Sequence, residues 1–189
     1  MPHQDEDGMT GGTGDGATSP AGSRLCVTCA LCCDGVLHDH ARVAPDEAAL
    51  LHALGLTTDT YSAHLGFGLP CLLLEGTRCS IYGSERPRVC GAYTCELLKA
   101  HLAGDVTIQQ AEPIIRRVRT LLAAVMAQLP AGSRVGDLRH TIRRAWDARG
   151  GPFETAAARQ ARAALLLASA TLRVYIGKHF LARKSSTQA

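Results

Sequence analysis

The stretch Cys26-Val27-Thr28-Cys29-Ala30-Leu31-Cys32-Cys33 decides how this 189-residue chain must be organised. Thiols at C-x2-C spacing are the ligands of a soft metal ion or of an iron–sulfur cluster. All the cysteines of the chain lie between positions 26 and 95, and the remaining ones are Cys71, Cys79, Cys90 and Cys95. The sequence therefore predicts a metal-binding region in the first half of the chain.

The same cysteines could in principle form disulfides, but the N-terminus argues against this. It is acidic and rich in glycine, without the apolar segment of a secretory signal. No apolar stretch is long enough to span a membrane. We therefore expect a cytoplasmic protein with no membrane partner, whose thiols stay reduced and available to metal.

Composition along the chain predicts three regions. Residues 1–23 are expected to be a disordered tail, since they are mostly Gly, Thr, Ser, Asp and Pro. Residues 24–104 are expected to form the cysteine-cluster metal-binding domain, and residues 105–184 a helical C-terminal region that packs on it. The predicted fold class is mainly α, with a small irregular cysteine-rich region containing a short β-hairpin.

Local signals within the cysteine region predict two elements. Pro45-Asp46-Glu47 suits the start of a short helix that ends at Gly55. Two short apolar runs, at 71–74 and 78–82, flank a Gly-bearing turn and predict a hairpin. Pairing of its arms should bring Cys71 towards Cys79.

Helical periodicity dominates the C-terminal region. Thr107 and Gln110 form a capping-box pattern before apolar residues at helical spacing, and Pro113 should kink or restart that helix. Further helices are expected over about 135–148, ending at Gly150-Gly151, and over about 153–181.

The cysteine run itself leaves two arrangements open. Cys26, Cys29 and Cys32 supply three thiolates on what we expect to be a tight turn. Bacterial-type ferredoxins share the C-x2-C-x2-C run but continue with C-x3-C-P, whereas here Cys33 follows Cys32 directly. Adjacent side chains diverge, so the two could serve different sites, or one could be a spare redox thiol. The thiols could accordingly form two four-thiolate sites, or one such site with additional reactive cysteines.

These residues resemble the YkgJ family, whose hallmark is the CxxCxxCC motif and whose members are described as zinc- or iron-chelating. The resemblance covers about residues 26–95 and includes Pro70-Cys71, Cys79-Ser80-Ile81-Tyr82 and Arg86-Pro87-Arg88-Val89-Cys90. It implies that the cysteines are the metal ligands, and it leaves zinc against iron open. The full ligand set that it implies is Cys26, Cys29, Cys32, Cys33, Cys71, Cys79, Cys90 and Cys95.

Arg86 is the one further candidate for the site, because a guanidinium near thiolates or cluster sulfurs would offset their negative charge. His38 and His40 could add metal ligands, although exposed polar residues are the favoured interpretation. We find no G-x-S-x-G or H-E-x-x-H motif, so the sequence assigns no catalytic residue.

Charge is divided unevenly between the two halves of the chain. Residues 1–96 carry 5 basic and 12 acidic residues, and residues 97–189 carry 15 basic and 5 acidic residues. The arginine clusters lack interleaved aromatic residues, so solvated helix faces are favoured over a nucleic-acid partner.

Three functions fit these observations. The first is an iron–sulfur protein, with a cluster that could be of the [4Fe–4S] type and a redox or electron-transfer role with a protein partner. The second is a zinc-binding structural or interaction module with four-thiolate sites. The third is a carrier that handles metal for transfer. The surplus of thiols and the adjacent Cys32-Cys33 pair favour iron.

Overall fold

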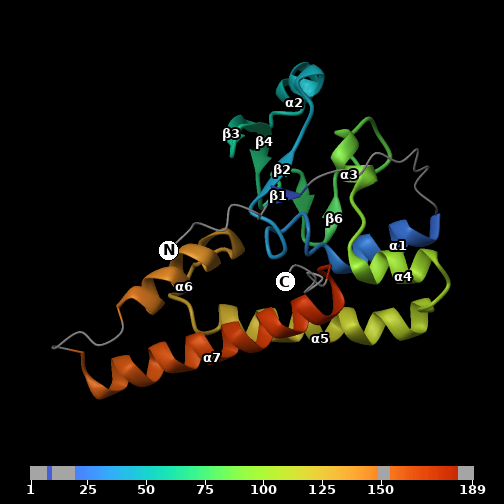
Figure 1. Ribbon diagram of the computed structural model, residues 1–189. Helices are drawn as coiled ribbons and strands as arrows, with labels where there is room; N and C mark the ends of the chain where they lie inside the picture. Colours follow the sequence, from blue (N-terminus) through green and yellow to red (C-terminus); the bar gives the residue numbers. More distant parts are fainter. Residues whose placement is uncertain (1–7, 10–19, 149–153, 183–189) are drawn as a thin grey trace, which may run out of the picture.

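The computed structural model describes residues 8–9, 20–148 and 154–182 (Figure 1). The described chain is mostly helical, at 54%, with small sheets near the cysteine-rich region, which confirms the predicted fold class. The predicted tail, residues 1–23, lies outside the described residues apart from Gly8–Met9 and the residues from Pro20 onward. The helix stop expected at Gly150-Gly151 also lies outside them.

One layer of the molecule consists of helices. The long helices α5 and α7 lie side by side, α6 packs on α7, and α1 contacts both α4 and α5 (Figure 1). None of the helices in the described ranges is long and apolar enough to cross a membrane. The bounds of these helices are α1 Pro20–Cys29, α4 Glu96–Leu102, α5 Ile108–Met126, α6 Leu138–Asp147 and α7 Ala156–His179.

The predicted capping box at Thr107 is confirmed. The Thr107 hydroxyl accepts a hydrogen bond from the Gln110 backbone N–H (3.3 Å), and the Gln110 side chain accepts one from the Thr107 N–H (2.8 Å). The expected restart at Pro113 is wrong, because α5 continues through it. Pro113 lies in the second turn of α5, so the helix continues there without the hydrogen bond that this position would donate to the Gln109 carbonyl.

The second layer is a small sheet with the strand order β1-β2-β4-β3, which Figure 1 shows on one side of the long helices. Strands β2 and β3 both pair antiparallel with β4, and β1 pairs parallel with β2. The strands are β1 Gly8–Met9, β2 His40–Arg42, β3 Thr58–Tyr61 and β4 His64–Gly68. Gly66 is required at its place in β4, since a Cβ there would lie 2.7 Å from the Ala41 carbonyl oxygen.

The two elements predicted in the cysteine region are both present. A 3-10 turn at Pro45–Glu47 leads into α2, Ala48–Ala53, and Gly55 follows in the left-handed conformation (φ +70°) that favours glycine. The hairpin is shorter than expected. Its strands are β5 Leu74–Glu75 and β6 Arg78–Cys79, and α3, Arg88–Ala92, comes after it.

Two hydrophobic cores result. The larger core lies among the helices and includes Ile115, Val118 and Phe180. The smaller core lies under the sheet and includes Leu51, Phe67 and Val89. Cys32 packs against both cores, so the cysteine region occupies the boundary between the two layers.

Candidate metal centre

The cysteine run begins in a helix rather than in the expected tight turn. Cys26 and Cys29 belong to the last turn of α1, where a spacing of three residues places them on one face. Ala30 then takes a left-handed conformation (φ +57°) and ends the helix. The chain turns back at this point, and Cys32 and Cys33 follow in the turn.

Four thiols gather on the helical side. Besides burial, the neighbouring thiols that raise the pKa of Cys32 are, in descending order of effect, Cys95, Cys29, Cys33 and Cys26. Cys26 in turn interacts with Cys95. We call Cys26, Cys29, Cys32 and Cys95 the first thiol group. Cys95 is the residue that immediately precedes α4. The first thiol group therefore combines the cysteines of the 26–32 run with one that is far away in the sequence.

The other four thiols gather on the side of the sheet. Cys33 interacts most strongly with Cys90, then with Cys71 and Cys79. Cys90 interacts with Cys71 and Cys79 in the same way. We call Cys33, Cys71, Cys79 and Cys90 the second thiol group. Cys71 precedes strand β5 and lies outside the paired part of the hairpin, but it interacts with Cys79, as predicted.

The two groups adjoin each other. Cys33 raises the pKa of Cys32 more than Cys26 does, and Cys26 has the smallest effect among the thiols that raise the pKa of Cys33. Cys26 and Cys90 are exposed, whereas the other six cysteines are partly buried. The pair of groups therefore reaches from the interior between the layers to the surface.

All eight thiols are free of disulfides. Among the described residues, no three His, Cys, Asp or Glu side chains converge closely enough, as they lie, to hold a metal ion. Each group is therefore a gathering of thiols from separate elements rather than a closed coordination shell.

Burial favours the protonated form of several of these thiols. It raises the pKa of Cys26 to about 11 and those of Cys29, Cys33 and Cys90 to about 12, and it raises the pKa of Cys32 as well. Cys26 and Cys90 follow this trend although part of their surface meets solvent, because protein atoms crowd the sulfurs. Neighbouring thiols add to the effect by disfavouring a second negative charge.

Backbone amides act in the opposite direction at three sulfurs. The N–H groups of Leu31 and Leu73 lower the pKa values of Cys29 and Cys71 against the larger effect of burial. Those of Leu97 and Leu98, at the start of α4, do the same for Cys95, although its side chain does not cap the helix with a full hydrogen bond. These amides favour the thiolate form that a metal requires.

Arg86 lies near both thiol groups. Its positive charge lowers the pKa of Cys26 in the first group and of Cys90 in the second, in each case against burial. The guanidinium stacks on the ring of Tyr82, 4.3 Å from its centroid. Stacking fixes the position of the charge, so Arg86 can offset negative charge on either group.

Sequence reasoning misjudged the two histidines nearest the run. His38 and His40 are buried, at 8% and 5% exposure, rather than exposed polar residues. His38 Nε2 and the Tyr93 hydroxyl share a 2.8 Å hydrogen bond, and the charges of Cys32 and Cys95 raise the pKa of Tyr93 further than burial alone. The sequence did not indicate the contact between His38 and Tyr93, because the fold brings together two residues that are 55 positions apart.

His40 belongs to the sheet instead. Its Nδ1 lies 2.6 Å from an Asp39 carboxylate oxygen, and its ring stacks on Tyr61 with centroids 4.3 Å apart. No thiol lies among these contacts. Neither histidine joins a set of converging metal-binding side chains in the described chain.

The C-terminal helices hold the cysteine turn in place. Arg119 of α5 donates to Asp34 over 2.7 Å, and Arg139 of α6 donates to the Leu37 carbonyl over 3.1 Å. At the end of α7, the Phe180 carbonyl accepts a hydrogen bond from the Glu96 N–H (3.1 Å), directly beside Cys95. The first thiol group therefore depends on helices far from it in sequence.

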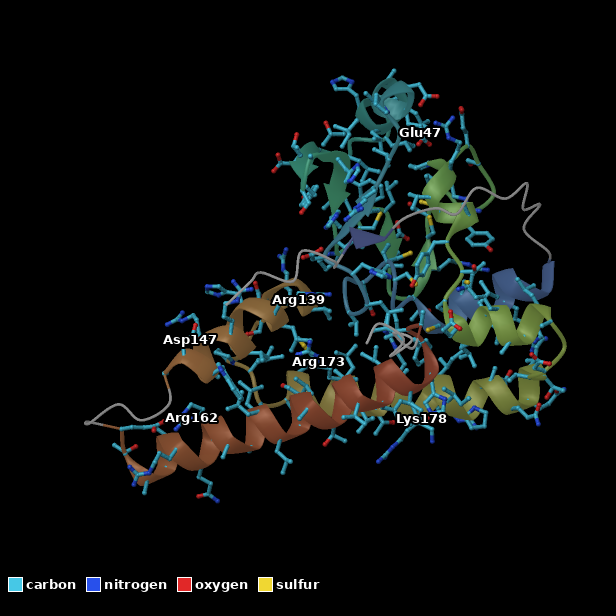
Figure 2. The ribbon with its side chains drawn as sticks, in the orientation of Figure 1. Glu47, Arg139, Asp147, Arg162, Arg173 and Lys178 are labelled. Atoms are coloured by element: carbon cyan, nitrogen blue, oxygen red, sulfur yellow. The ribbon has the colours of Figure 1, made fainter. Side chains whose placement is uncertain are left out.

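The position of Cys90 is fixed by a different contact. Glu47 is buried and accepts hydrogen bonds from the backbone N–H groups of Ala44 (3.0 Å) and Arg88 (2.7 Å). Arg88 also makes a two-point ion pair with Asp46, with distances of 2.7 and 3.0 Å. Figure 2 labels Glu47 close to the short helix that carries Cys90.

Comparison with known proteins finds a family match for the cysteine region. Residues 25–112 match the family CxxCxxCC, described as "Putative zinc- or iron-chelating domain". The match includes all eight cysteines, both thiol groups and the first residues of α5. No curated protein and no solved structure shows a significant match. Residues 25–112 of this chain are therefore similar to the CxxCxxCC family, whose description is "Putative zinc- or iron-chelating domain".

Proposed function

We propose that this domain binds iron in two neighbouring thiolate centres, one held by the first thiol group and the other by the second. The observation that carries the proposal is the division of the thiols into two sets of four, because four thiolates are the complete ligand set of an iron–sulfur cluster. A redox or electron-transfer role with a protein partner follows from that chemistry.

The membership of the first group favours a cluster over a lone ion. Three of its ligands come from a C-x2-C-x2-C run and the fourth, Cys95, is distant in sequence. In two-cluster bacterial ferredoxins the next cysteine after such a run serves the other cluster, and here the thiols that most raise the pKa of Cys33 belong to the second group. An iron–sulfur cluster, when bound, supplies one-electron redox chemistry.

The residues of the chain prepare these sites in three ways. The two hydrophobic cores pack against Cys29, Cys32, Cys71 and Cys95 and limit access of water. Backbone amides and the charge of Arg86 favour the thiolate forms. The side chains within each group would have to change rotamer to converge on a metal.

Zinc is the second candidate, and the same four-plus-four division favours it. Structural zinc is held by four thiolates in a tetrahedral shell, and two such ions would use every cysteine. In that case the sites would supply folding free energy rather than redox chemistry. The binding of iron or zinc for transfer to another protein would use the same ligands with faster exchange.

Metal content and visible absorption of protein purified anaerobically from iron-supplemented cells decide between these candidates. The proposal predicts a brown protein whose absorption bleaches on reduction, with iron and acid-labile sulfide in equal amounts. A colourless protein with two tightly held zinc ions would contradict the iron assignment and establish the zinc candidate.

A further inference from the structure

A groove opens beside the second thiol group, between α1 and the hairpin β5–β6. Its volume is about 740 Å³, within the range of small-molecule sites. The residues of its wall that matter below are Arg24, Thr28, Glu75, Arg78, Cys79 and Tyr82. Elements far apart in the sequence therefore form one concave surface at the edge of the candidate metal centre.

Two arginines face this groove without a partner in the described part of the chain. Arg24 comes from α1 and Arg78 from β6, and neither makes a hydrogen bond or ion pair through its guanidinium with another described residue. By contrast, Arg88, Arg119 and Arg162 are each paired with a carboxylate. Two unpaired arginines that line one groove from different elements are suited to a ligand with oxyanionic groups.

The rest of the wall adds shape and selectivity. Tyr82 offers a hydroxyl, and its ring is held by the guanidinium of Arg86. Glu75 is the one acidic residue among those that line the groove, and it stands opposite Arg78 in the hairpin register. Its carboxylate limits the net positive charge of the groove. Cys79 belongs to the second thiol group and lines the groove, so a ligand in the groove would lie beside that group.

We infer that this groove binds a small molecule that carries phosphate or carboxylate groups, held between Arg24 and Arg78. Cys79 is the one thiol that lines the groove, and the proposed contacts to the anion come from other side chains. The inference therefore applies whether the thiols bind iron or zinc. It adds to the metal site a neighbouring ligand site through which a small anion reaches the second thiol group.

Calorimetric titration of the full metal-loaded chain tests this inference, with pyrophosphate in one arm and citrate in the other. At least one of them should bind saturably, and the arm that binds more tightly identifies the oxyanion class. Arg24→Gln and Arg78→Gln should each weaken binding by about tenfold or more. Glu75→Gln should tighten it about two- to fivefold, because a like charge is removed. Arg173→Gln, on the exposed face of α7, is the matched control and should change nothing (Figure 2).

Two results would overturn the inference. The first is the absence of saturable binding of both anions to wild-type protein. The second is an equal loss of affinity in the Arg24, Arg78 and Arg173 variants, which would mean that overall charge alone attracts the anion. Metal content is measured for every sample, so a failure of the metal proposal is recorded separately from a failure of the groove.

Discussion

Cys32 and Cys33 are consecutive residues whose strongest electrostatic interactions are with thiols of different groups. Cys32 interacts first with Cys95, beside the helices, whereas Cys33 interacts first with Cys90, beside the sheet. Side chains of adjacent residues diverge, so one peptide unit divides the thiols between two groups. In the proposed arrangement, the double cysteine at the end of the CxxCxxCC motif lies at the boundary between the two candidate centres.

The helical region beyond the family match should be needed by the first thiol group. Phe180 is 1% exposed and its carbonyl binds the Glu96 N–H next to Cys95. Phe180→Ala should lower the free energy of unfolding by about 3–4 kcal/mol and weaken metal retention by the first group more than by the second. Chemical denaturation and metal content check this prediction. Leu167→Ala, at a 71% exposed position of α7, is the control and should leave both quantities unchanged.

The ion pair between Asp34 and Arg119 should contribute to stability. Asp34 is buried, and burial raises its pKa although Arg119 and the Val36 N–H favour the charged form. Arg119→Met leaves that carboxyl without its charged partner and should cost about 1–3 kcal/mol, measured by denaturant unfolding. Arg117→Met, at an exposed position of the same helix, should cost less than about 0.5 kcal/mol. Equal effects of the two substitutions would refute a stabilising role for the pair.

Arg86 should tune the centres electrostatically. Its charge favours negative charge at Cys26 and Cys90, so Arg86→Gln should make reduction of an iron–sulfur centre harder and lower the reduction potential. Spectroelectrochemical titration measures the shift, and Arg173→Gln should produce none. Arg86→Lys keeps the positive charge and should restore most of the potential. An unchanged potential in Arg86→Gln would show that its charge does not reach the centres.

The metal-free chain should lose stability in alkali, because burial raises the pKa of its thiols. An unfolded cysteine titrates near pH 9, its ordinary value, while Cys29 and Cys33 keep their protons to about pH 12 when folded. The unfolded chain therefore holds fewer protons in that window, so the free energy of unfolding falls as the pH rises from about 9. Denaturant melts of apo-protein at pH 7.5 and pH 10 test this. Equal stability at both values would contradict the assigned burial of the thiols.

Metal binding should show the opposite dependence on pH. Each thiol must lose its proton to become a ligand, so affinity rises with pH by up to about tenfold per unit for every proton displaced. Calorimetry with zinc in buffers of different ionisation enthalpy counts the protons released. About four per bound ion are expected, and a count near zero would mean that thiols are not the ligands.

Local rules of sequence predicted the parts of the fold that local contacts determine. The Thr107 capping box, the helix that ends at Gly55 and the hairpin at Gly76 follow from signals within a few residues. Strand β4, with the sequence His64-Leu65-Gly66-Phe67-Gly68, has no clear alternation and little β-branching, so nothing local marked it. Its register depends on pairing with β2 and β3, which a single sequence does not reveal.

The candidate site shows the same limit. The cysteines could be named as ligands from spacing and family resemblance, whereas the division of Cys32 from Cys33 required the turn after Ala30. The burial of His38 depends on Tyr93, 55 positions away. Cys26 and Cys29 lie at the end of a helix rather than in the predicted tight turn. A spacing of three residues is compatible with both structures, so the spacing alone could not distinguish them.

The most direct test of the account is the metal content of wild-type protein, Cys32→Ser, Cys33→Ser and the double variant, each prepared anaerobically and measured by elemental analysis. Two separate centres predict that each single variant loses about half of the bound metal and that the double variant loses nearly all of it. A complete loss in both single variants, or no loss in one of them, would contradict the division of the thiols into two groups of four.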